Sequence, residues 1–202
     1  MKISLDLKLN FTAILAFLIL VIMTPCVLLL PEYLGYENGL FENIQMGVLF
    51  LCCFFALRAS GNKKFFTFIF LFLTILILRE VNCGRTLFFP IPNEPNAFYS
   101  WKDLGLNKIV HSVFGAYIGL VGLYFIFNKL WNDLKFFLFE TKIPLFNVIF
   151  LAVGIFLSLV AEKFANNLIF EELSELIMYL SILGIIYTYS KNIKITETNS
   201  AN

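Results

Sequence analysis

The chain has 202 residues, of which 59% are hydrophobic and only 14% charged, and its formal net charge is +1. These fractions lie far outside the average for soluble domains and predict a membrane protein. A near-zero charge without a basic patch argues against nucleic acid as a partner.

The first predicted element is an uncharged apolar stretch at residues 10–30. As a helix it is long enough to cross the roughly 30 Å of bilayer hydrocarbon. The stretch ends at Pro31 and offers no small-residue cleavage site. We therefore interpret it as a retained span rather than a signal peptide.

Two further apolar runs follow, at residues 44–59 and 65–78. The second is short for a membrane span. We expect its helix to continue through Arg79 and Glu80 toward Gly84, which would place this charged pair on a helix rather than in a loop.

The longest connection comes next and contains three prolines between residues 90 and 95, which cannot continue a helix. The aromatic residues at 98–101 are typical of the membrane interface. A fourth span is predicted at 109–127, where Gly115 and Gly119 form a G-x-x-x-G spacing. We interpret this spacing as a contact within the chain, with dimerisation as the alternative.

The remaining elements complete a helical bundle. Residues 131–140 alternate apolar and charged residues at helical spacing and predict a helix along the membrane surface. Spans five and six are predicted at 144–160 and 173–189, and the polar tail at 191–202 is expected to be disordered. The fold class is thus all-α, a polytopic membrane bundle of about six transmembrane helices, with residues 1–190 forming a single domain.

The distribution of charge predicts the orientation of this bundle. In the six-span arrangement, ten Lys and Arg residues lie on the side of the termini and five on the other side. The positive-inside rule then makes both termini cytoplasmic. Acidic residues show the opposite bias, four against ten, and because they contribute little to orientation this bias indicates another role.

A polar pocket at the outward face is the candidate site. Ionisable groups at membrane depth are expensive and by default mark a functional site. Glu172 and Glu175 are three residues apart and therefore share one face of a helix. Ion pairs that only fix the bundle are the alternative interpretation. The candidate residues are Arg79, Glu80, Arg85, His111, Glu162, Lys163, Glu171, Glu172 and Glu175.

We expect neither a metal nor a cofactor in this pocket. His111 is the only histidine, which excludes a histidine-rich zinc or haem site. It is interpreted as an interfacial residue, with a single proton carrier as the alternative. A site for a hard divalent cation is the weaker possibility, and its ligands would be Glu80, Glu162, Glu172 and Glu175.

The four cysteines do not indicate a disulfide scaffold. Cys52 and Cys53 are adjacent in an apolar run, where thiols behave as small hydrophobic groups. Only Cys26 and Cys83 lie toward the same face, and we expect them to be unpaired.

Sequence motifs do not assign a reaction, because no nucleophile elbow and no phosphate-binding loop is present. Whether the protein is an enzyme is left open. The favoured hypothesis is a small bacterial inner-membrane protein of the cell envelope. Its outward-facing polar pocket would serve a binding or structural role in an envelope complex, with membrane lipids and other envelope membrane proteins as partners.

Two alternative functions stay open. One is a membrane-embedded enzyme acting on a lipid or lipid-linked substrate in the outer leaflet. The other is a proton-coupled transporter, which is disfavoured because the charges gather at one face rather than at the membrane midplane.

Overall fold

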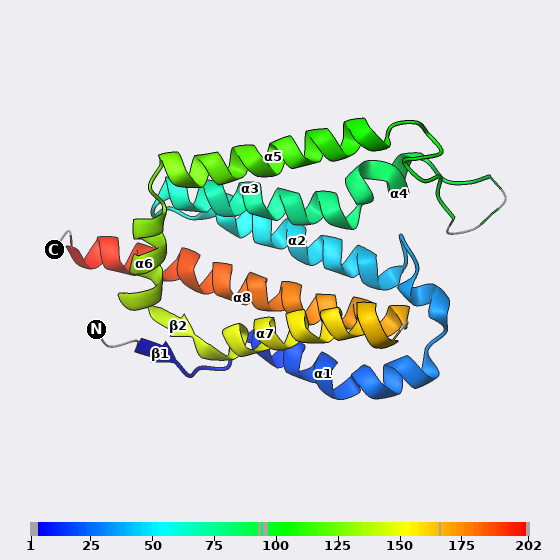
Figure 1. Ribbon diagram of the computed structural model, residues 1–202. Coiled ribbons are helices and arrows are strands. Elements are labelled where there is room, and N and C mark those ends of the chain that lie inside the picture. Colours follow the sequence, from blue (N-terminus) through cyan, green and yellow to red (C-terminus); the bar gives the residue numbers. More distant parts are fainter. Residues whose placement is uncertain (1–3, 93, 95–96, 166, 201–202) are drawn as a thin grey trace.

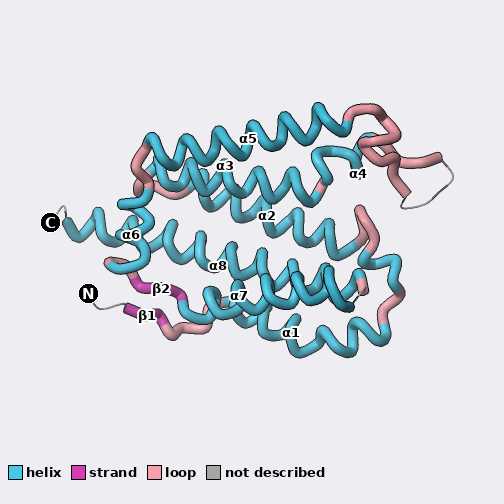
Figure 2. Tube along the Cα trace, viewed as in Figure 1, coloured by secondary structure: helices cyan, strands magenta, loops and turns pink. Residues whose placement is uncertain are grey.

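The computed structural model describes residues 4–92, 94, 97–165 and 167–200 and is built almost entirely of helices. Within them lie α1 (Phe11–Leu29), α2 (Leu40–Arg58), α3 (Lys63–Glu80), α4 (Arg85–Phe88), α5 (Asn107–Phe127), α6 (Trp131–Phe139), α7 (Leu145–Val160) and α8 (Leu168–Ser200). Shorter 3₁₀ turns occur at Glu32–Gly35 and Asn82–Gly84, and a π-helical turn at Ala161–Ala165. The sequence did not predict the short parallel pair of strands β1 (Ser4–Asp6) and β2 (Lys142–Pro144), which is visible in Figure 2.

Helix α8 occupies the middle of the bundle and packs against α1, α2 and α7 (Figure 1). Helix α3 packs on α2, and α5 packs on α3. Strand β1, helix α6 and the C-terminal part of α8 lie at one end of the molecule. The connections that follow α1, α3 and α7 lie at the opposite end. Long helices therefore alternate in direction along the chain.

Four helical segments are long and apolar enough to cross a membrane: Phe11–Leu29, Glu32–Arg58, Asn107–Phe127 and Leu145–Lys163. A fifth arises if α3 and the segment Asn82–Phe88, bent by 59° relative to it, count as one span. This is the pattern of a multi-pass membrane protein. The expected number of about six spans stays a prediction. The sequence predicts a disordered tail at 191–202, whereas helix α8 continues to Ser200.

The end of α3 departs from the prediction in one respect. The helix does continue through Arg79 and Glu80, as expected, but it stops there instead of reaching Gly84. The residues Asn82, Cys83 and Gly84 have φ angles of 46°, 54° and 91°. Left-handed backbone cannot continue a right-handed helix, so the chain turns away just beyond the Arg79–Glu80 pair.

Helices α2 and α8 both begin earlier than their apolar runs indicated. Helix α2 starts at Leu40 rather than at residue 44, and its first turn contains Glu42, which is buried. Helix α8 starts at Leu168 rather than at residue 173. Glu42 therefore lies on α2 itself, and Glu171 and Glu172 lie on α8, on the helix where the sequence analysis expected them.

Gly154 allows α7 to approach α8 closely. A Cβ on Gly154 of α7 would lie 2.8 Å from the backbone nitrogen of Met178 on α8. In contrast, a Cβ on Gly115 or Gly119 of α5 would meet nothing within 4 Å. The interpretation of the G-x-x-x-G spacing as a contact within the chain is therefore wrong, because this face of α5 is open.

All four cysteines are free thiols. Cys52 and Cys53 are buried in the core cluster formed by α2, α3 and α8. Cys26 and Cys83 are partly buried and unpaired, as expected.

Candidate functional site

A cavity of about 660 Å³ opens at the end of the bundle opposite β1 and α6. Its walls are the start of α2, the end of α3, the end of α7 and the start of α8, together with the turn after α1. The acidic cavity, as we name it, is lined by the seven glutamates Glu37, Glu42, Glu80, Glu162, Glu171, Glu172 and Glu175. Segments far apart in sequence thus bring carboxylates to one place.

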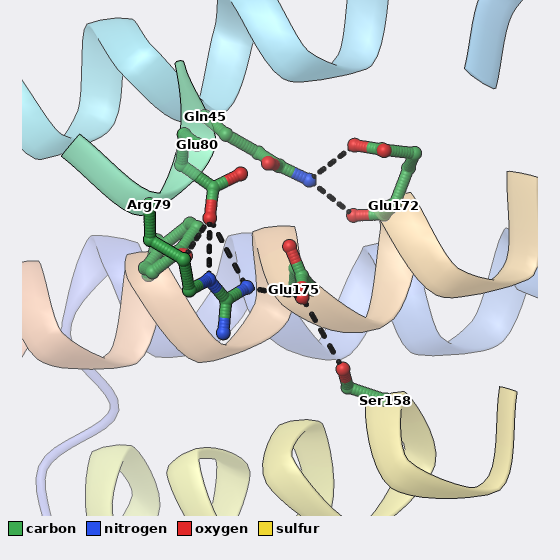
Figure 3. Close-up of polar contacts among 7 residues, drawn as sticks. Gln45, Arg79, Glu80, Ser158, Glu172 and Glu175 are labelled. Atoms are coloured by element: carbon green, nitrogen blue, oxygen red, sulfur yellow. Dashed lines mark hydrogen bonds and ion pairs between the residues drawn. The ribbon is translucent and has the colours of Figure 1, made fainter. Parts of the chain in front are cut away.

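Arg79 is the only basic residue among the described residues that line the acidic cavity. Its guanidinium group forms ion pairs with Glu80, at 3.1 Å, and with Glu175 (Figure 3). The Ser158 hydroxyl also donates to Glu175, and the Tyr179 hydroxyl donates to Glu80 at 2.6 Å. One cation therefore balances two largely buried carboxylates, and these carboxylates have further hydrogen-bond donors from α7 and α8.

The basic partner of Glu80 differs from the one that helix geometry favours. Adjacent residues point to different sides of a helix, which favours Arg85 or Lys163 over Arg79 as the partner of Glu80. The long Arg79 side chain nevertheless folds back onto its neighbour. Arg85 instead binds Glu37, at 2.5 Å, and the exposed Lys163 forms no ion pair within the described residues.

Gln45 lies directly behind the wall of the acidic cavity and is completely buried. Its amide nitrogen donates to the side-chain Oε2 of Glu172, at 2.7 Å, and to the main-chain oxygen of the same residue, at 2.8 Å. These two acceptors fix the orientation of the amide, because the exchanged orientation would set oxygen against oxygen. The other amide atom, Oε1, has no hydrogen-bond partner.

The remaining carboxylates have few donors of their own. Buried Glu42 accepts a hydrogen bond from the backbone nitrogen of Asn38. Glu162 and Glu171 receive no hydrogen bond and no ion pair from the part of the chain that the structure describes. The acidic cavity therefore has more acceptors than the surrounding side chains can satisfy.

The structure places the nine candidate residues unequally. Six line the acidic cavity: Arg79, Glu80, Glu162, Glu171, Glu172 and Glu175. Arg85 and Lys163 do not line it, and His111 lies exposed on α5.

The sequence analysis missed Glu42 and Gln45. Their spacing of three within an apolar helix puts both on one face, and this signal was available. It was weak, because a single acid in the first turn of a span is also typical of an interfacial residue.

The acidic cavity has the volume of a small-molecule site and, among the described residues, no group of side chains arranged as metal ligands. No group of three or more His, Cys, Asp or Glu side chains within residues 4–92, 94, 97–165 and 167–200 is placed to hold a metal. The divalent-cation alternative, with Glu80, Glu162, Glu172 and Glu175 as ligands, gains no support from this arrangement. A volume of about 660 Å³ is in the range of small-molecule sites.

No protein-family model, no curated protein sequence and no solved structure matches this chain.

Proposed function

We propose that this multi-pass membrane protein is a binding protein whose acidic cavity takes a small organic cation. The observation that supports the proposal is the imbalance of charge: seven glutamates and one arginine line a single cavity. A concave surface lined by one sign of charge attracts ligands of the opposite sign. Desolvated carboxylates also need charged or hydrogen-bonding partners, which a cationic ligand supplies.

Size and shape favour an organic cation over an inorganic one. A bare divalent ion requires several oxygen atoms converging on one point, and the described side chains provide no such point. A molecule with donor groups at two or more positions can instead satisfy carboxylates on several walls. Glu162 and Glu171 near the mouth and Glu172 beside the buried Gln45 are separate acceptors of this kind.

The proposal includes an orientation. We infer six spans with both termini in the cytoplasm of a bacterium, because Lys and Arg gather at the end that carries β1 and α6. The acidic cavity then opens on the outer side of the inner membrane. A ligand would reach it from outside the cell or from the outer leaflet, as expected for a component of the cell envelope.

Calorimetric titration of the full chain in an uncharged detergent tests the binding function. The ligands are butane-1,4-diamine as the organic cation, Mg²⁺ and Ca²⁺ as metal probes, and citrate as an anionic control. We expect the diamine to bind and citrate not to bind. If no cation binds, or if a metal ion binds and the diamine does not, the proposal is wrong.

A matched pair of variants localises the binding. The double substitution Glu162→Gln/Glu171→Gln removes two carboxylates that have no described partner, so the fold should tolerate it. It should weaken diamine binding by about tenfold, since each charge contributes roughly 0.5 to 1 kcal/mol at a partly exposed position. Glu32→Gln is the control, because Glu32 is exposed at the same end but does not line the cavity. Because Glu32→Gln removes one charge and the double variant two, a loss of binding free energy in Glu32→Gln of half that in the double variant would indicate only general charge attraction.

A further inference from the structure

We infer that a small cavity at the end of the molecule opposite the acidic cavity binds the phosphate of an anionic phospholipid between Arg58 and Lys191. The cavity measures about 150 Å³ and lies between the end of α2 and the C-terminal part of α8 (Figure 1). It is separate from the acidic cavity and does not depend on the function proposed for it. The residues that line it are Phe55, Arg58, Tyr187, Ser190 and Lys191.

An aromatic pair brings the two basic side chains to this cavity. The rings of Phe55 on α2 and Tyr187 on α8 meet edge to face, with 5.2 Å between their centroids. Arg58 lies three residues beyond Phe55, and Lys191 lies four residues beyond its aromatic neighbour on α8. Each basic residue is thus one helical turn from a ring of the pair and on the same side of its helix. Contact between the two rings therefore brings both cations to one place.

These two cations have no carboxylate partner within the part of the chain that the structure describes. The Arg58 guanidinium instead lies over the ring of Phe54, 5.5 Å from its centroid, and the Lys191 ammonium lies over the ring of Tyr187, at 5.8 Å. An aromatic ring holds a cation in position but does not neutralise its charge. Two like charges that line one cavity repel each other, and an anion between them turns this repulsion into attraction.

The chemistry and the size of the cavity match a single phosphate group. The planar guanidinium of Arg58 can bind two phosphate oxygens side by side, and the ammonium of Lys191 adds a second positive charge. A volume of about 150 Å³ is below that of sites that enclose a whole small molecule. The rest of the ligand must therefore lie outside the cavity.

The surface beside the cavity is apolar and favours a lipid as the source of the phosphate. Leu51 and Phe54 lie seven and four residues before Arg58, share its face of α2 and are each 49% exposed. They belong to a segment that is long and apolar enough to cross a membrane, so in a bilayer this strip contacts acyl chains. A lipid can place a chain along the strip and its phosphate at the basic pair, as anionic lipids do at basic pockets between spans.

Native mass spectrometry of the full chain in an uncharged detergent tests the inference. The probes are phosphatidylglycerol, phosphatidylcholine with the same acyl chains, and glycerol 3-phosphate as a soluble phosphate. We expect phosphatidylglycerol to bind about tenfold more tightly than phosphatidylcholine, and glycerol 3-phosphate not to displace it. Equal binding of the two lipids would overturn the inference. Displacement by glycerol 3-phosphate would assign the cavity to a soluble phosphate and exclude the lipid.

A matched pair of double variants separates the cavity from the general positive charge at the same end. Arg58→Gln/Lys191→Gln removes two exposed cations, so the fold should tolerate it. It should weaken phosphatidylglycerol binding by about tenfold and abolish the preference over phosphatidylcholine. Lys63→Gln/Lys64→Gln removes two exposed charges at the start of α3, outside the cavity, and should leave the preference intact. Equal losses in the two double variants would mean that only general attraction acts, and the site would be wrong.

A substitution that conserves charge tests the contact itself. Arg58→Lys keeps the positive charge but removes the planar fork, so the affinity for phosphatidylglycerol should fall by about fivefold, the usual effect of one hydrogen bond. Lys63→Arg is the control and should leave the affinity unchanged. An unchanged affinity in Arg58→Lys would overturn the phosphate contact. None of the substituted residues lines the acidic cavity, so failure of this inference and failure of the proposed function are distinguishable.

Discussion

Gly184 on α8 lies against the side chain of Asn147 on α7 so closely that a Cβ at Gly184 would be 2.1 Å from the Asn147 amide nitrogen. That amide is buried, donates to Thr12 on α1 at 2.9 Å, and accepts from Asn10 at 2.7 Å through its oxygen. The hydrogen bonds that join α1 to α7 therefore occupy the space that a side chain on α8 would need.

Gly184→Ala should consequently destabilise the protein by about 2 kcal/mol or more, because it both overpacks the interface and displaces buried polar groups. Thermal unfolding in detergent measures this loss. Gly119→Ala is the matched control, since a Cβ there meets nothing within 4 Å. Alanine at an open helical position should leave the melting temperature unchanged or slightly raised. A stable Gly184→Ala protein would show that the Asn147 network can rearrange without cost.

Arg79→Gln should have opposite effects on stability and on ligand binding. Loss of the guanidinium leaves Glu80 and Glu175 without a cation, and their side chains are only 7% and 11% exposed. Because Arg79 itself is half exposed, we expect a loss of about 1 to 3 kcal/mol rather than the larger cost of breaking a fully buried pair. The affinity for a cation should rise, since the competing positive charge is gone.

Restoring the charge balance provides the check on Arg79. The double variant Arg79→Gln/Glu175→Gln should regain part of the lost stability, and a double-mutant cycle measures the coupling. Additive effects of the two substitutions would mean that the ion pair contributes nothing measurable.

Tyr179→Phe tests the hydrogen bond that holds Glu80. Tyr179 is completely buried, and its hydroxyl donates to the Glu80 carboxylate at 2.6 Å. Removing a donor to a charged, nearly buried acceptor should cost about 1.5 to 3 kcal/mol, measured by thermal or denaturant unfolding. Tyr33→Phe, at an exposed tyrosine, should change stability by less than about 0.5 kcal/mol. Similar melting temperatures for the two variants would show that the hydrogen bond from Tyr179 to Glu80 does not stabilise the protein.

The orientation of the bundle predicts the behaviour of topology reporters. Alkaline phosphatase is active only outside the cytoplasm, so its fusion after residue 190 should be inactive. Its fusion within residues 97–105, at the end that carries the acidic cavity, should be active. The reverse pattern would place the cavity in the cytoplasm and exclude a ligand from the outer side.

The sequence predicted the helices well because a membrane span needs a long apolar run. It placed α1, α5 and α7 within a few residues of their observed bounds. It placed the starts of α2 and α8 too late, since a pattern based on hydropathy ends at the first polar residues. The first turn of α2 contains Glu42, whose carboxylate accepts a hydrogen bond from the backbone of Asn38, and hydropathy alone cannot reveal such a partner.

The sequence predicted only part of the site. Helical spacing groups Glu171, Glu172 and Glu175, but the direction in which the Arg79 side chain turns depends on the position of α8, which no local pattern specifies. The glycines likewise show that sequence spacing alone does not identify close contacts between helices. The recognised spacing at Gly115 and Gly119 makes no contact, while Gly154, which belongs to no motif, touches the backbone of α8.

The central position of α8 has a consequence for biosynthesis. Helices α1, α2 and α7 each pack extensively on α8, yet α8 follows all three in the chain and leaves the ribosome after them. The three earlier helices must therefore enter the bilayer before α8 is available, and Asn147 and Gln45 lack part of their final surroundings until α8 has been synthesised. Chains terminated before residue 168 would lack the wall that carries Glu171, Glu172 and Glu175, and they should be targets for membrane proteases rather than partly active products.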